Sequence, residues 1–399
     1  MVFDLYFKQY TKWFASYDRN TWNYEDACVI IGLRELYSAT GDKVWWDAVK
    51  AFYSRYINED GTIRLYDESE YNLDRIPGGR ALFDLLKETG DEKYRKAIEA
   101  LAGQMKRQPR AKCGSFWHKN IYPNQIWLDG LYMGLPFYML YANLTGDASI
   151  YDDVVRQFRN AREHIFDEEK KIYYHAWDES RSIFWCDKET GLSANFWSRA
   201  LGWYLMALAD VYEYMPEDRK EDRETIASIW KEAMDGMLLY QDKESGMFYQ
   251  LTALGKTVEG NYLETSSSMM VAYSLFKGAL LGVFKDEHYI DAAISALMGT
   301  AIQKFTFVNG KLSLGGMCKG AGLGPDGNFK RDGSVAYYLA EEVVADEQKG
   351  TGVSMLAYAE YIKAAKAGLI PDSFPHVELF KRNYDPILPT DPGFKATMN

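Results

Sequence analysis

The sequence predicts an all-α fold in which about six helical hairpins close into a ring, an (α/α)6 barrel. A hairpin signature recurs in the segments that begin at Leu36, Leu85 and Leu140. These units differ in length and most of all in their connecting loops, whereas an open solenoid usually keeps a tight repeat with a strict consensus. No Pro/Gly/Ser-rich linker interrupts the 399 residues. We therefore favour the ring over the solenoid and expect a single domain over residues 1–399.

Local signals place the helix ends within each unit. Three glycines stand where a helix should end, and each is followed by an Asp that can cap the next helix. These glycines are Gly41, Gly90 and Gly146. Apolar residues then recur at helical spacing. Weaker versions of the pattern cover residues 210–238 and 278–305, and residues 353–369 predict one more helix.

Charge and composition exclude two classes of partner. The formal net charge is −11, whereas nucleic-acid binding needs clustered Lys and Arg. No run reaches the roughly 18 apolar residues of a membrane helix, and the first residues lack a basic segment followed by an apolar one. We expect a cytoplasmic protein without nucleic-acid or membrane partners, unless a leader was trimmed. Four widely spaced cysteines predict reduced thiols rather than a zinc site or a disulfide framework: Cys28, Cys113, Cys186 and Cys318.

Asp129 lies in the stretch "NQIWLDGLYMGLPF", among apolar and aromatic neighbours and with almost nothing polar nearby. If this stretch opens an inner helix, desolvation raises the carboxyl pKa while the helix N-terminus favours the anion. Such a balance yields a group that both gives and takes a proton. Gly130 and Gly134 permit close approach of a ligand or a neighbouring helix. The alternative is a first-turn dipole or capping residue without chemistry.

A second carboxylate, Asp74, stands before another helical run in "EYNLDRIPGGRALFDLL". Its place in the repeat matches that of Asp129, one hairpin earlier, so the two would face each other across the mouth of the ring. Paired carboxylates are the usual catalytic groups in glycoside hydrolysis. Asp74 could equally be an N-cap.

Trp197, Arg199 and Trp203 form the third candidate element, in "NFWSRALGWYLMAL". Arg199 and Trp203 are i,i+4 neighbours and share a helix face, where an Arg offers two donors to a carboxylate and indoles offer stacking faces to a sugar. The alternative is an amphipathic helix with Trp in the core. His175 and His118, the latter beside Lys119, have no metal-ligand spacing, and either is more often structural.

Two further segments carry weaker signals. The glycine-rich residues 312–327 follow no strand–helix context, so a flexible pocket wall fits better than a phosphate site. Glu264, Thr265 and Ser266 precede an apolar run and predict a helix start that could reach the pocket.

Taken in order, "YNLDRIPGGRALFDLL", "SFWHKN", "NQIWLDGLYMGLPFYMLYANLTGD", "YYHAWDES", "NFWSRALGWYLMALADV" and "NYLETSSSMMVAYSL" resemble the unsaturated rhamnogalacturonyl hydrolases, glycoside hydrolase family 105. The unsaturated glucuronyl hydrolases of family 88 are related to them. The resemblance implies an (α/α)6 barrel and a small substrate: a short oligosaccharide whose terminal uronyl residue carries the C4=C5 double bond that polysaccharide lyases leave. It implies no metal and no other cofactor.

Carried over residue by residue, the resemblance implies that Asp129 is the general acid and base and that Asp74 is a second active-site carboxylate. It implies that the sugar site is lined by His175, Trp197, Arg199 and Trp203, with His118 and Lys119 close by. Arg199 or Lys119 could bind the substrate carboxylate. A glucuronyl hydrolase for glycosaminoglycan-type disaccharides, a conventional inverting glycosidase and a non-catalytic carbohydrate-binding protein are the alternatives. The neighbouring sugar and the oligomeric state stay open.

Overall fold

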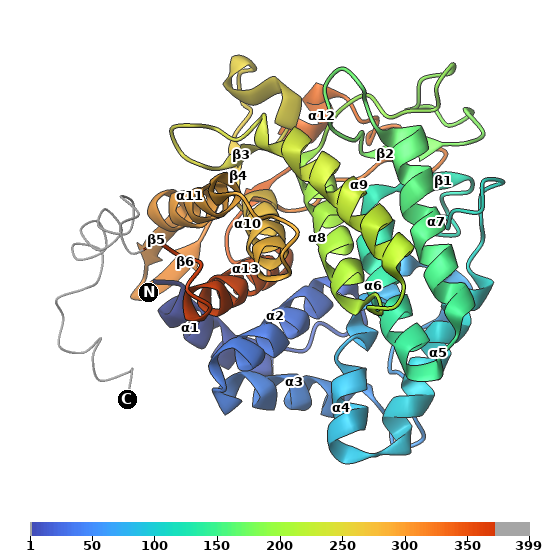
Figure 1. Ribbon diagram of the computed structural model, residues 1–399, viewed down its shortest axis with the longest axis vertical. Helices are drawn as coiled ribbons and strands as arrows, with labels where there is room; N and C mark the ends of the chain where they lie inside the picture. Colours follow the sequence, from blue (N-terminus) through green and yellow to red (C-terminus); the bar gives the residue numbers. More distant parts are fainter. Residues whose placement is uncertain (1, 372–399) are drawn as a thin grey trace.

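The computed structural model describes residues 2–371 and has the predicted ring of helices (Figure 1). Six helices line the ring, and most of them are buried on nearly every side: α2 (Tyr24–Thr40), α4 (Leu82–Thr89), α6 (Leu128–Thr145), α8 (Ser198–Tyr214), α10 (Thr265–Leu280) and α13 (Gln348–Lys366). Helices α6, α8, α10, α13 and α2 contact one another in that order, and the short helix η3 (Pro77–Gly79) before α4 contacts both α2 and α6. The contact between α13 and α2 closes the ring.

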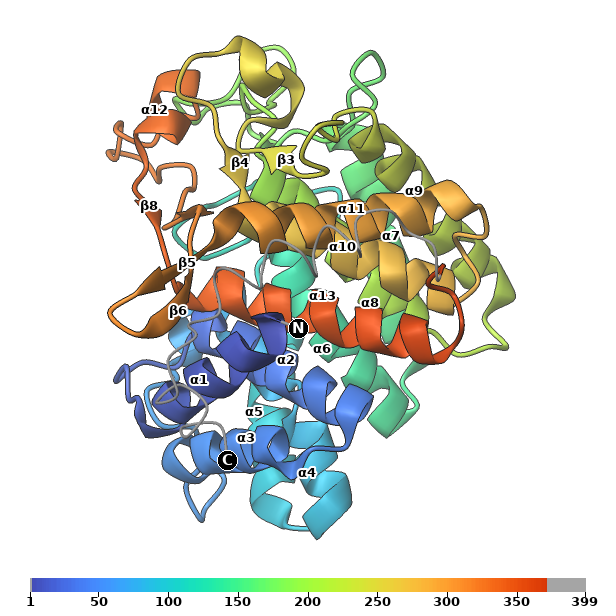
Figure 2. The same cartoon turned by 90° about the vertical axis from the view of Figure 1, so that its left-hand side faces the viewer.

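An outer layer covers these helices: α3 (Lys43–Tyr56), α5 (Glu92–Arg107), α7 (Ala148–Ile165), α9 (Lys220–Leu238) and α11 (Glu287–Lys304). The sixth outer position belongs to the N-terminal helix α1 (Val2–Ser16), which contacts α13 and α3 (Figure 2). A hydrogen bond of 3.0 Å joins the hydroxyls of Tyr6 and Thr351. The first and the last helix of the described residues therefore build the sixth hairpin, which the sequence repeat did not predict.

The predicted helix boundaries are confirmed. Gly41, Gly90 and Gly146 end their helices with φ of 73°, 67° and 72°, the left-handed conformation that glycine adopts without strain. The following aspartates cap α3, α5 and α7 through side-chain acceptance of backbone N–H groups: Asp42, Asp91 and Asp147.

Several short strands precede inner helices. Four antiparallel pairs form: β1 (Gln125–Trp127) with β2 (Ala176–Asp178), β3 (Phe248–Tyr249) with β4 (Leu263–Glu264), β5 (Phe305–Val308) with β6 (Lys311–Leu314), and β7 (Met317–Cys318) with β8 (Val343–Val344). The remaining elements are η1 (Glu68–Glu70), η2 (Leu73–Arg75), η4 (Thr252–Thr257) and α12 (Val335–Ala340). Strands β3 and β4, helix α12 and the loops beside them lie in the upper part of Figure 1. Strands β1 and β4 run directly into α6 and α10, so the ladders fix where these inner helices begin.

One large core of buried residues extends from Val2 to Ala364. The single-domain prediction also covers residues 372–399, which lie outside the described part of the chain, and it stays a prediction. All four cysteines are unpaired, as expected. Within residues 2–371 no helix has the length and apolarity to cross a bilayer.

Candidate active site

The β1–β2 ladder brings Asp129 and His175 together. Trp127 pairs with Ala176, and the Leu128 N–H donates to the His175 carbonyl at 3.2 Å. Asp129, in the first turn of α6, then places its Oδ2 3.1 Å from His175 Nε2. The two atoms are at ion-pair distance without hydrogen-bond alignment, and neither has a hydrogen-bond partner within residues 2–371. The carboxylate that lacked polar neighbours in sequence has an imidazole beside it in space.

Tyr338 of α12 fixes the other side of His175. Its hydroxyl lies 2.6 Å from His175 Nδ1. Burial raises the pKa of Tyr338 well above its usual range, so the hydroxyl keeps its proton at neutral pH. Nδ1 is the one side-chain partner of this hydroxyl in the described chain, and we therefore infer that Tyr338 donates to Nδ1. In a neutral imidazole the proton then sits on Nε2, the nitrogen that faces Asp129.

Asp74 is an ionised carboxylate held by Lys119. The Leu73 N–H donates to the His118 carbonyl at 3.2 Å, which aligns η2 with the loop before β1. Lys119 Nζ lies 2.5 Å from Asp74 Oδ2, and His118 Nε2 lies 3.6 Å from Oδ1. Burial raises the pKa of Asp74, but Lys119 and, less strongly, His118 lower it, so it falls below its ordinary value. Asp74 is therefore charged at neutral pH.

His118 is neutral under the same conditions. Burial lowers its pKa to about 4, against a smaller opposing effect of Asp74. The contact between His118 and Asp74 is therefore not an ion pair near pH 7, and Lys119 is the counterion. Asp129 and His175 also act on the pKa of His118, which places both carboxylates around one imidazole.

A stack of three rings forms one wall of this site. The ring of Trp127 stacks on Tyr122 at 4.5 Å and on His118 at 4.8 Å. Gly130 permits this arrangement, because a Cβ there would lie 3.0 Å from His118 Nδ1 and 3.2 Å from Leu73 Cδ1. The close approach that the sequence predicted at Gly130 is thus made by a neighbouring loop.

Arg199 is committed to a buried ion pair. Its Nη2 donates to Glu264 Oε1 at 3.1 Å and also to the Cys318 carbonyl, and its Nε donates to Ser266 Oγ at 2.8 Å. Arg199 is 1% exposed and Glu264 is fully buried. Glu264 also caps α10 through Ser267 N–H, which confirms the predicted helix start. Only Nη1 of Arg199 is buried without a partner within residues 2–371.

The two tryptophans near Arg199 pack on protein rings. Trp197 lies 4.8 Å from the His175 ring and 2% of it is exposed. Trp203 stacks on Tyr132 at 4.9 Å and is 1% exposed. Trp197 therefore borders the site directly, whereas Trp203 supports it from within the core.

Sequence reasoning missed several residues of this site. Trp127 lies inside the predicted stretch, two positions before Asp129, and its aromatic character was a usable signal. Tyr122 and Tyr338 lie outside this stretch, and only the fold brings them near Asp129. The glycine-rich residues 312–327 do form a wall, because a Cβ on Gly322 would touch the Trp127 indole at 3.4 Å.

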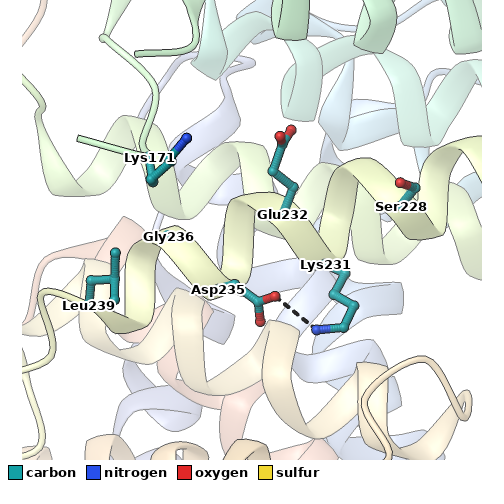
Figure 3. A pocket seen from close by; sticks show the side chains of 7 residues that line it. All are labelled: Lys171, Ser228, Lys231, Glu232, Asp235, Gly236 and Leu239. Atoms are coloured by element: carbon teal, nitrogen blue, oxygen red, sulfur yellow. Dashed lines mark hydrogen bonds and ion pairs between the residues drawn. The ribbon is translucent and has the colours of Figure 1, made fainter. Parts of the chain in front are cut away.

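A hollow of about 440 Å³ lies elsewhere, along α9 (Figure 3). It is lined by Lys171, Ser228, Lys231, Glu232, Asp235, Gly236 and Leu239. Its charges pair with protein groups: Lys231 Nζ lies 2.8 Å from Asp235 Oδ2, and Glu232 binds Arg162 at 2.5 Å. None of the predicted site residues lines it, and we attach no chemistry to it.

Comparison with known proteins agrees with this geometry. The sequence model of Glycosyl Hydrolase Family 88 matches residues 4–365. A solved family 105 glycoside hydrolase from C. acetobutylicum ATCC 824 is 42% identical, with a TM-score of 0.82 over 86% of this chain and 94% of its own. The chain therefore belongs to the glycoside hydrolases of families 88 and 105, which confirms the resemblance and the enzyme class.

Two more distant relatives have named activities. The unsaturated rhamnogalacturonyl hydrolase YesR of Bacillus subtilis (strain 168) is 24% identical over 69% of this chain and 75% of its own. The unsaturated glucuronyl hydrolase of Bacillus sp. GL1 has a TM-score of 0.61 at 15% identity, with 88% of each chain covered, a likeness that shows the fold alone.

Proposed function

We propose that the protein hydrates the C4=C5 double bond of an unsaturated uronyl residue at the non-reducing end of lyase-generated oligosaccharides, and so releases the neighbouring sugar. The observation that carries this proposal is the pairing of Asp129 with His175 beside a second carboxylate that stays ionised. The named activity of YesR supports it. Unsaturated galacturonyl- or glucuronyl-rhamnose is the preferred substrate class, and glycosaminoglycan-type disaccharides are the second candidate.

In the proposed reaction, protonated Asp129 donates its proton to C4 of the unsaturated ring. Positive charge develops at C5 and on the ring oxygen, and the resulting Asp129 carboxylate takes a proton from the water that attacks C5. The product is a hemiketal at C5. The bond between C5 and the ring oxygen then breaks, which leaves a ketone at C5 and an open-chain hemiacetal at C1. This hemiacetal still carries the neighbouring sugar and expels it as an alcohol. One water is consumed.

His175 and Asp74 take different parts in this scheme. His175 Nε2, 3.1 Å from Oδ2, presents the positive end of its N–H dipole to the Asp129 carboxylate that exists after proton donation, and so stabilises that charge. Asp74 contributes a fixed negative charge, held by Lys119, to a site where positive charge develops. His118 packs against α6 between the two carboxylates.

The remaining candidates line or support the sugar site. Trp197 packs against the His175 ring, and Trp203 stacks on Tyr132 within the core. Arg199 fastens the starts of α8 and α10 to each other through Glu264, and its unpartnered Nη1 is the one atom left for a ligand.

The test follows the ultraviolet absorbance of the conjugated C4=C5 carboxylate on a panel of lyase-generated disaccharides. Wild type should remove it, whereas Asp129→Asn should lower kcat by about 10³-fold, since general acid–base catalysis contributes roughly 10²- to 10⁴-fold. Asp152→Asn is the matched control, because that carboxylate is 69% exposed on the outer helix α7. Cleavage of saturated glycosides without any loss of the absorbance would establish a conventional glycosidase instead.

A further inference from the structure

The predicted cations of the site are already paired. Lys119 neutralises Asp74 at 2.5 Å. Arg199 is shut off from solvent against Glu264, Ser266 and the Cys318 carbonyl. Neither is therefore free to supply an unshared positive charge to an anionic substrate.

Arg331 is different, because its guanidinium is half-buried and has no hydrogen-bond or ion-pair partner within residues 2–371. A Cβ on Gly322 would lie 3.3 Å from Arg331 Nη1 and 3.4 Å from the Trp127 indole. The guanidinium and the indole thus both lie next to Gly322. Asp332, the next residue, accepts the Ser334 N–H at 2.9 Å and does not pair with Arg331.

The backbone around Arg331 is held in place. The Gly324 N–H donates to the Arg331 carbonyl at 2.8 Å, and the Trp185 indole N–H donates to the Gly324 carbonyl at 3.1 Å. Two residues on, the Gly333 carbonyl accepts the Asn195 side-chain amide at 2.7 Å. These bonds fix where the Arg331 side chain starts, so its position beside Trp127 is set by the fold rather than by an ion pair.

The charge of Arg331 reaches the catalytic region. Burial raises the pKa of Tyr122, and four charged groups act on the same phenol: Lys119, Asp74, Arg331 and Asp129. Tyr122 stacks on Trp127 at 4.5 Å. Arg331 is therefore grouped around one ring with both carboxylates and with Lys119.

We propose that the Arg331 guanidinium binds an anionic group of the substrate, either the C5 carboxylate of the unsaturated ring or a carboxylate or sulfate on the neighbouring sugar. This inference rests on the proposed function. A guanidinium presents two parallel donors that match a carboxylate or sulfate edge, and a half-buried cation without a partner gains most from such a ligand because part of its hydration is already lost.

The experiment compares Arg331→Gln and Arg331→Lys with wild type, and uses Lys330→Gln as the matched control. Lys330 is the adjacent, exposed cation and takes no part in the site. Three substrates are needed: an unsaturated uronyl-rhamnose disaccharide, its C5-carboxyl methyl ester, and the same disaccharide sulfated on rhamnose. Far-ultraviolet circular dichroism and melting temperature check that each variant folds.

We expect Arg331→Gln to lower kcat/KM by about 10- to 100-fold, mainly through KM, as for loss of a hydrogen bond to a charged group. Arg331→Lys should recover part of the loss, and Lys330→Gln should match wild type. If the carboxylate is the ligand, the methyl ester abolishes the difference between wild type and Arg331→Gln. If sulfate or another anion of the neighbouring sugar is the ligand, the difference is confined to the sulfated substrate.

Kinetics of Arg331→Gln within about twofold of wild type on all three substrates would overturn the inference alone. An equal loss in Arg331→Gln and Lys330→Gln would also overturn it, since it would indicate a general effect of charge in this loop. An inactive wild type on every unsaturated substrate would overturn the proposed function itself, and the two failures are therefore distinguishable.

Discussion

Replacing Glu264 by Gln should destabilise the protein more than an ordinary surface substitution. Both Glu264 oxygens are saturated: Oε1 accepts from Arg199 and from Cys318 N–H at 3.0 Å, and Oε2 accepts from Ser266 Oγ at 2.7 Å and from Ser267 N–H at 2.6 Å. Burial raises the pKa of Glu264, but Arg199 and these N–H groups lower it below its usual value. The carboxylate is therefore charged, and a carboxamide would turn one acceptor into a donor facing donors.

The size of the effect follows from the uncompensated charge. Breaking a buried ion pair on one side costs about 3 to 5 kcal/mol, because the Arg199 guanidinium stays buried without its anion. Unfolding entropy scales with chain length, so for a chain of this size the loss corresponds to a fall in melting temperature of about 5 °C. Urea denaturation followed by circular dichroism measures the same loss as a lower midpoint at unchanged m.

A double variant separates charge from packing. Arg199→Met with Glu264→Met removes both charges at similar volume, and it should be more stable than either Arg199→Met or Glu264→Met alone. Single variants that unfold at the wild-type midpoint would refute the reasoning. So would a double variant whose loss in free energy of unfolding equals the sum of the losses of the two single variants. Activity of the folded double variant also shows whether Arg199 Nη1 contacts substrate.

Three further predictions concern the loop around His118. The folded pKa of His118, about 4, lies below that of an unfolded imidazole, so the unfolded chain binds the extra proton and the free energy of unfolding should fall between about pH 6.5 and 4, by up to roughly 3 kcal/mol. His118→Gln should lose that slope. Lys119→Met should raise the pKa of Asp74 by removing its counterion, which moves the acid limb of the kcat/KM profile to higher pH. Gly130→Ala should destabilise the fold by about 1 to 3 kcal/mol, because its Cβ would press on His118 and Leu73.

Each of these has a contrary outcome. Parallel pH–stability curves for wild type and His118→Gln would show that the imidazole titrates alike in both states. An unmoved acid limb in Lys119→Met would mean that Asp74 ionisation does not govern activity. A Gly130→Ala variant with the wild-type urea midpoint would mean that the loop carrying His118 can move aside without loss of folding free energy. Gly103→Ala is the control, because a Cβ there would meet only the far end of the flexible Arg107 side chain.

The fold was predictable because its signals are local. The conformation of Gly41 and the cap at Asp42 depend on residues within one turn, so they can be read from the sequence, and the same signals recur in the next two units. The contact of α1 with α13 could not be read in this way. It joins the first and the last helix of the described residues, and no repeat period marks it.

The sequence singled out the candidate residues of the site but not how they pair. Asp129 stands out because a carboxylate in an apolar stretch needs a reason to be there. Its neighbour His175 depends on the β1–β2 register, and strands of three residues leave almost no trace in the sequence. The sequence also did not show that Arg199 and Lys119 each have a protein carboxylate as partner, Glu264 and Asp74 respectively, and their predicted contact with a substrate anion stays a prediction.

Asp129 and His175 lie on buried elements whereas Arg331 lies on a loop, and this difference has a kinetic consequence. Asp129 sits on the first turn of a buried helix and its imidazole partner on the adjoining ladder, so their mutual geometry is set by rigid elements. Arg331 sits on a loop outside the inner helices, beside the aromatic wall. Loops tolerate sequence change that buried helices do not. Substitutions at Asp129 or His175 should therefore act on kcat for every substrate, whereas substitutions in residues 319–334 should act on KM and differ from one substrate to another.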